Sequence, residues 1–178
     1  MQLKDIEIVK VSKEMMNKAL ADSKGLQENY GRNNRDGGNL REVRGSLAQQ
    51  AVKVWLDTQT SIDYEWSDPF QKGLYGDKWD FIIAGESYDV KCRNWWNPTY
   101  YYNVDFFMGV HEQNKEVDNY IFTTTDRNME AVYIYGAISY TRLWNKLEKP
   151  HNKPGKFPNA GTIHCRNLVP LYKYIYKI

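Results

Sequence analysis

The segment spanning residues 79–96, WDFIIAGESYDVKCRNWW, limits the folds open to this chain more than any other. Two apolar runs on either side of Gly85 predict a β-hairpin. The second of these strands carries Asp89 and Lys91 in its middle, between apolar neighbours. Because side chains alternate along a strand, residues two positions apart share a face. The two charges are therefore either an ordinary solvent-facing pair or part of a chemical site.

The position of the turn decides which other residues join this face. We predict a two-residue turn at Gly85–Glu86, which places Ile82 opposite Asp89 and Asp80 opposite Lys91. Asp80, Asp89 and Lys91 then emerge on one side of the hairpin, with the two aspartates roughly 7 Å apart as diagonal neighbours. A three-residue loop would reverse the assignment of Asp80.

Two carboxylates beside a lysine meet the needs of phosphodiester hydrolysis. Mg²⁺ prefers oxygen ligands and usually takes one or two carboxylates, which leaves positions for water and phosphate oxygens. Such a cation polarises the phosphoryl group and lowers the pKa of a bound water. An adjacent ammonium group holds the attacking water or offsets charge on the phosphoryl oxygens. We therefore expect Asp80 and Asp89 to bind Mg²⁺, with Mn²⁺ as a substitute, and Lys91 to assist the water.

Composition limits the classes of partner. The chain has 178 residues, enough for a single domain with a hydrophobic core. With 24 lysines and arginines against 22 acids, its net charge is only +2, so a nucleic acid would have to meet a local basic patch. The two cysteines, Cys92 and Cys165, form neither a disulfide framework nor a zinc site. No apolar run approaches a membrane span, so we expect a cytoplasmic protein without a membrane partner.

Hydrophobic periodicity predicts the elements around the hairpin. Apolar residues recur at steps of three and four over residues 40–57, which indicates an amphipathic helix of about four turns. Further strands are expected near residues 103–110, 120–125 and 131–136, and a short helix near 139–147. The alternation in LYKYIYKI, residues 171–178, predicts a terminal strand. This order predicts one α/β domain built around a central sheet.

An aspartate that opens one strand and an acid-x-Lys triplet in the next, as in DFIIAGESYDVK (residues 80–91), resemble the core of the PD-(D/E)XK nuclease superfamily. The resemblance spans about residues 40–125, including the preceding helix. It implies a restriction-endonuclease-like α/β fold in a single domain, with a central mixed β-sheet flanked by helices. It also implies a Mg²⁺-dependent DNA endonuclease that dimerises to cut both strands, and the compact size suggests a phage or mobile-element enzyme acting in a bacterial, archaeal or phage-infected cell. The alternative is a module of the same fold that binds nucleic acid or protein without cleaving it.

The helix before the hairpin is expected to supply a further site group. In helices of the superfamily a glycine is followed four positions later by glutamate, and here the residue four positions after Gly45 is Gln49. Glu42 lies one heptad before Gln49, so both side chains can share a helical face. Either Glu42 supplies the carboxylate, as a third metal ligand, or the site uses the amide of Gln49. Glu42 is alternatively an exposed acid that stabilises the helix N-terminus.

Basic residues gather before this helix and directly after Lys91. Four of them form the densest basic region of the chain: Arg32, Arg35, Arg41 and Arg44. Arg93 and Asn94 follow Lys91, and the aromatic residues after them either stack on unpaired bases or pack in the sheet. We expect these four arginines, Arg93 and Asn94 to contact DNA, the four chiefly through backbone phosphates. The alternative for the first four is a solvated loop and helix start.

Overall fold

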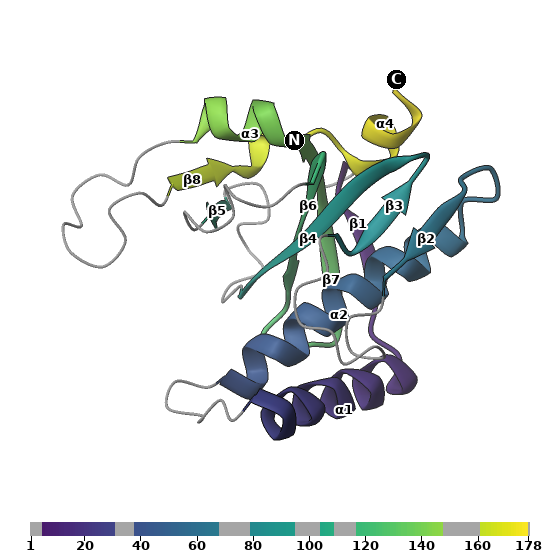
Figure 1. Cartoon of the computed structure of the whole chain (residues 1–178), viewed down its shortest axis with the longest axis vertical. Helices are drawn as coiled ribbons and strands as arrows, with labels where there is room; N and C mark the ends of the chain where they lie inside the picture. Colours follow the sequence, from purple (N-terminus) through teal and green to yellow (C-terminus); the bar gives the residue numbers. More distant parts are fainter. Residues whose placement is uncertain are drawn as a thin grey trace.

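The computed structural model describes residues 5–30, 38–67, 79–94, 104–108, 117–147 and 161–177, with the backbone alone at 26–30, 38, 39 and 94. In chain order the elements are β1 (Glu7–Lys10), α1 (Lys13–Tyr30), α2 (Gly38–Asp57), β2 (Tyr64–Trp66), β3 (Phe81–Ile83), β4 (Glu86–Asn94), β5 (Asp105–Met108), β6 (Asn119–Thr125), β7 (Ala131–Ser139), α3 (Tyr140–Lys146), β8 (Gly161–His164), the 3-10 turn η4 (Cys165–Asn167) and α4 (Leu171–Tyr176). They form one mixed α/β domain, with a six-stranded sheet of order β1-β7-β6-β4-β3-β2 and a two-stranded sheet, β5-β8 (Figure 1). The predicted α/β class is confirmed.

The large sheet is mixed because β4 and β6 run parallel, whereas every other neighbouring pair in it is antiparallel. Parallel neighbours need a long crossover connection, and β5 lies in the chain between these two strands. β4 is thereby enclosed between β3 and β6, and its residues Asp89 and Lys91 pair with Tyr120 and Phe122 of β6. In the described residues β3 pairs with β4 only over Glu86–Tyr88, so at Asp89 and Lys91 the paired neighbour of β4 is β6 alone.

Two hydrophobic clusters fill opposite faces of the large sheet. Under α2, Trp55 packs with Phe81, Ile121 and other apolar side chains of β3, β4, β6 and β7. The second cluster joins the sheet to β5, β8 and α3, and its large buried aromatic side chains include Phe106, Tyr120 and Phe122. Neighbours along a strand point to opposite faces, so Ile121 of β6 points into the first cluster, whereas Tyr120 and Phe122 point into the second. Figure 1 shows α1 and α2 side by side below the strands, whereas β5, β8 and α3 lie together at the upper left.

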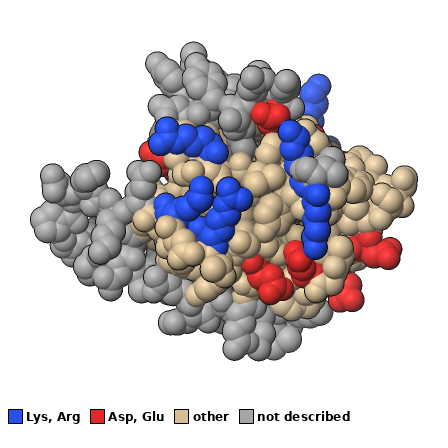
Figure 2. Space-filling model, turned by 90° about the horizontal axis from the view of Figure 1, so that it is seen from above, with Lys and Arg blue, Asp and Glu red and all other residues tan. Residues whose placement is uncertain are grey.

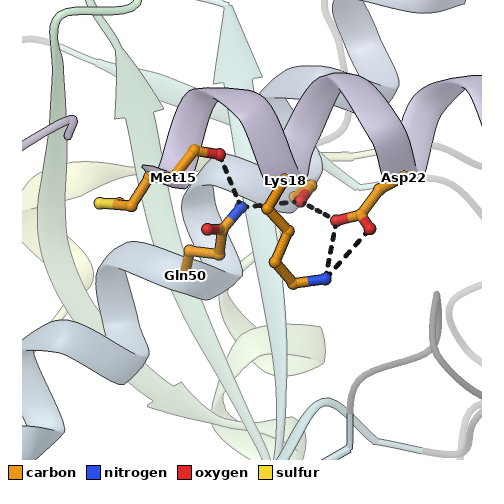
Figure 3. A network of polar contacts seen from close by, with 5 residues as sticks. Met15, Lys18, Asp22 and Gln50 are labelled. Carbon is orange, nitrogen blue, oxygen red and sulfur yellow. Dashed lines mark hydrogen bonds and ion pairs between the residues drawn. The ribbon is translucent and has the colours of Figure 1, made fainter. Parts of the chain in front are cut away.

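A polar network joins α1 to α2 (Figure 3). The carboxylate of Asp22 accepts hydrogen bonds from Nζ of Lys18 at 3.0 Å and from Oγ of Ser46 at 2.6 Å. Nε2 of Gln50 donates to Oγ of Ser46 and to the backbone carbonyl of Met15, both at 3.1 Å. The side chain of Asp22 is only 8% exposed, so these bonds replace most of its hydration. The network therefore holds α1 against α2, the helix that carries Gln49.

Replacement of Asp22 by alanine is expected to lower the free energy of unfolding by about 2 kcal/mol, because Ser46 and Lys18 lose a charged acceptor in a partly buried position. Urea denaturation measures the effect. A matched control is Lys53→Ala, which breaks the more exposed pair between Lys53 and Asp57 and should change stability by less than about 1 kcal/mol. Equal effects of the two variants would show that the network adds no more than a surface ion pair.

The turn between β3 and β4 lies one residue earlier than the sequence predicts. Ile83 pairs with Glu86, so the two turn residues are Ala84 and Gly85, and both have positive φ angles, 49° and 82°. The predicted turn at Gly85–Glu86 is therefore wrong, as is the pairing of Asp80 with Lys91. Moving a two-residue turn by one position shifts the register by two residues, which leaves each side chain on its predicted face. Nothing in the sequence marks an alanine for a left-handed conformation.

Replacement of Ala84 by asparagine is expected to raise the free energy of unfolding by about 0.5–1 kcal/mol. An alanine with positive φ is strained, and Asn-Gly is the preferred pair for a two-residue turn in which both φ angles are positive. Ala84 is exposed, so the larger side chain meets no core packing. Thermal melting of the two proteins measures the change. A lower melting temperature for the variant would contradict the assigned turn.

The predicted terminal strand is wrong, because residues Leu171–Tyr176 form helix α4. Leu171, Tyr174 and Ile175 pack against the cluster under α2, and their spacing of three and four is helical. Over six residues, Tyr172, Tyr174 and Tyr176 alternate as in a strand, so periodicity alone could not separate a strand from a helix. Within the described residues, no helix is long and apolar enough to cross a membrane.

Candidate active site

Asp89 and Lys91 form a close ion pair on β4. Nζ of Lys91 lies 2.5 Å from Oδ2 of Asp89, and the carboxylate is 5% exposed whereas the lysine side chain is 23% exposed. Tyr88 and Val90 pack into the cluster under α2, so the charged pair projects from the opposite face. There, Nζ of Lys91 also lies 5.9 Å from the centre of the Tyr120 ring. The burial of the carboxylate disfavours an ordinary solvent-facing pair.

Asp80 is held between α2 and β4 by two hydrogen bonds. β3 starts one residue after Asp80, so the backbone N–H of Val90 lies beyond the paired part of β3; it donates to Oδ2 of Asp80 at 2.6 Å. Nε2 of Gln49 donates to Oδ1 of Asp80 at 2.9 Å. Because Val90 separates Asp89 from Lys91 along β4, the Asp80 carboxylate lies against the backbone that carries the ion pair. The structure thus brings Gln49 to Asp80 and places Asp80 against the β4 backbone between Asp89 and Lys91, whose side chains project from the face opposite α2.

Gln49 is the residue of α2 that reaches Asp80. Glu42 lies about 10 Å nearer the N-terminus of the helix, because seven helical residues rise by that distance. Its Oε2 accepts a hydrogen bond from Oγ of Ser23 on α1 at 3.4 Å. The sequence leaves both residues open as the group from this helix. In the structure Gln49 joins the aspartate, whereas Glu42 contacts α1.

A hollow of about 360 Å³ opens beside Lys91. The described residues that line it combine three cationic side chains, one thiol and three phenylalanines: Arg41, Lys91, Arg93, Cys92, Phe106, Phe107 and Phe122. Arg41 comes from α2 and Arg93 from β4, so packing of the helix on the sheet brings together two of the arginines predicted to bind DNA. The aromatic residues of β5 and β6 were not predicted to border the site, because the sequence gives no sign that the small β5–β8 sheet lies there.

Arg44 lies near the same surface, because its charge acts on Cys92. Burial raises the pKa of the Cys92 thiol to about 11, against the opposing effects of a hydrogen bond with Thr123 and of the positive charge of Arg44. The thiol is therefore protonated at neutral pH. A protonated thiol is a poor nucleophile, which disfavours such a role for Cys92 beside Lys91.

The structure does not describe the side chains of the other residues predicted to contact DNA. Arg32, Arg35 and the aromatic residues from 95 to 102 lie outside the described residues, and Asn94 ends β4 with only its backbone described. On the face shown in Figure 2, basic and acidic side chains form separate small groups. This distribution suits a net charge of +2 and means that any attraction of a polyanion depends on local patches such as the hollow.

Asp80, Asp89 and Gln49 carry the kinds of oxygen atom that a hard divalent cation prefers. Asp80 and Asp89 offer carboxylates, and Oε1 of Gln49 is buried and accepts no hydrogen bond from the described residues. Amide oxygens and carboxylates are both ligands of such cations, and Mg²⁺ commonly binds to one or two carboxylates while keeping several waters. In the part of the chain that the structure describes, no group of three or more His, Cys, Asp or Glu side chains is placed to hold a metal.

Comparison with known proteins adds no family to this description. No protein-family model matches the chain, and no curated protein is significantly similar to it in sequence. The function proposed below therefore depends on the arrangement of the side chains themselves.

Proposed function

We propose that this chain is a Mg²⁺-dependent DNA endonuclease of the PD-(D/E)XK kind, in which Mn²⁺ can replace Mg²⁺. The observation that carries the proposal is the Gln49–Asp80 hydrogen bond beside the Asp89–Lys91 ion pair, next to a hollow lined by arginines. Buried carboxylates with fixed partners, an ammonium group and a cationic surface are the parts that phosphodiester hydrolysis requires. A homodimer, which the resemblance implies, would present two such sites to the two strands of a duplex.

Each residue has a distinct role in this proposal. Asp80 and Asp89 would hold the cation, and Gln49 would both orient Asp80 through Nε2 and offer Oε1. When bound, Mg²⁺ polarises the phosphoryl group and acidifies a water molecule. The backbone N–H of Val90 keeps the Asp80 carboxylate in place before substrate arrives, which limits the reorganisation needed during the reaction.

Lys91 and the arginines act on the substrate. The Lys91 ammonium is partly exposed and borders the hollow, so it can hold the attacking water or offset charge that develops on the phosphoryl oxygens. Arg41 and Arg93 would bind phosphates on either side of the scissile bond and fix the register of the strand.

The proposal predicts DNA cleavage that depends on a divalent cation. Purified protein is incubated with supercoiled plasmid and with single-stranded DNA, in Mg²⁺, Mn²⁺ or excess EDTA, and the products are resolved by electrophoresis. We expect nicked, linear or shortened products with either cation and none with EDTA, because the two carboxylates cannot activate water alone. Intact DNA of both kinds in the presence of each cation would refute the nuclease.

A module of the same fold that binds DNA without cleaving it is the second candidate. It is favoured by the neutral Gln49 at the helix position where the resemblance implies an acid. This module would bind DNA equally in EDTA and Mg²⁺ and leave it intact. The variant Gln49→Glu separates the two cases further: a gain of cleavage only in the variant would identify the missing acid as the reason for inactivity.

A further inference from the structure

The hollow beside Lys91 contains an aromatic side chain that hydrolysis itself does not use. β5 has alternating burial: Phe106 and Met108 are each 1% exposed, whereas Phe107 is 50% exposed. Phe107 therefore points away from the hydrophobic core that buries Phe106 and Met108. It lines the same hollow as Arg41 and Arg93.

We infer that Phe107 stacks on an unpaired nucleobase, and that the substrate of this site is single-stranded or locally unpaired DNA. The inference rests on the proposed nuclease function and specifies its substrate class. Each base has a π-face, but in an intact duplex the faces are covered by neighbouring bases. An aromatic ring inside a cationic hollow can therefore meet a base face only where the strand is unpaired.

The lining of the hollow favours a nucleotide over other occupants. Three cations, Arg41, Lys91 and Arg93, lie around phenylalanine rings, which is the combination that binds a charged backbone and stacks its bases. The volume of about 360 Å³ falls in the range of pockets that hold one small ligand, roughly 300–1,000 Å³. A site for an apolar protein segment would instead show a contiguous apolar patch, whereas the lining of this hollow mixes three cationic side chains with the phenylalanines.

Equilibrium binding tests the inference without cleavage. A fluorescein-labelled single strand and a duplex of the same sequence are titrated in EDTA with wild-type protein, and fluorescence anisotropy gives each Kd. We expect tighter binding of the single strand. Phe107→Ala should weaken single-strand binding roughly 5- to 20-fold, as stacking of one base on an aromatic ring predicts. The same variant should leave duplex binding within about twofold of the wild type, because a paired base offers no free face to Phe107.

Two further variants separate stacking from loss of structure. Phe107→Trp retains an aromatic face and should keep the preference for the single strand. Tyr176→Ala removes an aromatic residue of similar exposure, 41%, from α4, which does not contribute to the described lining of the hollow, and should change neither affinity. A melting temperature for each variant confirms folding.

The results distinguish this inference from the nuclease proposal. Equal or tighter binding of the duplex, or an equal loss of both affinities in Phe107→Ala, overturns the inference, even if Mg²⁺-dependent cleavage of the duplex upholds the nuclease. Single-strand binding that depends on Phe107 supports the inference, even if no DNA is cleaved in Mg²⁺ or Mn²⁺ and the nuclease proposal fails.

Discussion

Replacing Lys91 by alanine is expected to lower the rate of Mg²⁺-dependent DNA cleavage by about 10²- to 10³-fold. The ammonium group borders the hollow and lies 2.5 Å from the buried Asp89 carboxylate, where a fixed charge is poorly screened by water. Loss of one group that stabilises developing charge commonly has an effect of this size. Initial rates on a labelled oligonucleotide, measured at saturating Mg²⁺, give the ratio.

Loss of folding has to be separated from loss of chemistry in this variant, because Lys91→Ala leaves a buried carboxylate without its cation. Lys91→Arg keeps the positive charge and the ion pair but replaces the compact ammonium group with a larger, planar guanidinium group. It should melt close to the wild type and still cleave at least about tenfold more slowly. Lys53→Ala, which removes another ion-paired lysine away from the site, should cleave normally. A folded Lys91→Ala protein with wild-type cleavage would exclude this lysine from the reaction.

Replacing Gly136 by alanine is expected to have the largest effect on stability, a loss of about 3 kcal/mol or more in the free energy of unfolding. Gly136 has φ of 144°, and an added Cβ would lie 2.1 Å from the backbone oxygen of Val169 and 2.7 Å from its carbonyl carbon. These are backbone atoms of the segment that pairs with β7 in an antiparallel bridge at Ala137. Val169 exchanges two backbone hydrogen bonds with Ala137 at 2.8 and 3.0 Å, so the segment cannot move away without losing them.

For a chain of this length, such a loss should lower the melting temperature by about 6–12 °C. Differential scanning calorimetry or circular dichroism measures the shift. Gly45→Ala is the matched control: Gly45 lies inside α2, nothing lies within 4 Å of its added Cβ, and alanine is the better helix former. That variant should be as stable as the wild type or more so. A melting temperature of Gly136→Ala within about 2 °C of the wild type would contradict the tight approach of Val169 to β7.

The elements that could be predicted are those set by local physics. The amphipathic helix before the hairpin is observed as α2, and the paired strands on either side of Gly85 are observed as β3 and β4, because apolar periodicity reports directly which face of an element is buried. Periodicity did not identify α4, because Tyr172, Tyr174 and Tyr176 alternate as in a strand while Leu171, Tyr174 and Ile175 follow the helical spacing. Nor could it predict a left-handed Ala84, since that conformation depends on how the hairpin packs.

The shared face of Asp89 and Lys91 was determined by the sequence alone, because the alternation of side chains along a strand is a local property. Three features were decided only by the tertiary structure: the close, buried contact of Asp89 with Lys91, the approach of Gln49 rather than Glu42 to Asp80, and the arginines and phenylalanines around one hollow. The reason is physical. Burial of apolar surface between segments far apart in the chain decides which turn of α2 faces the start of β3 and where β5 lies relative to β4. No local sequence pattern records that packing.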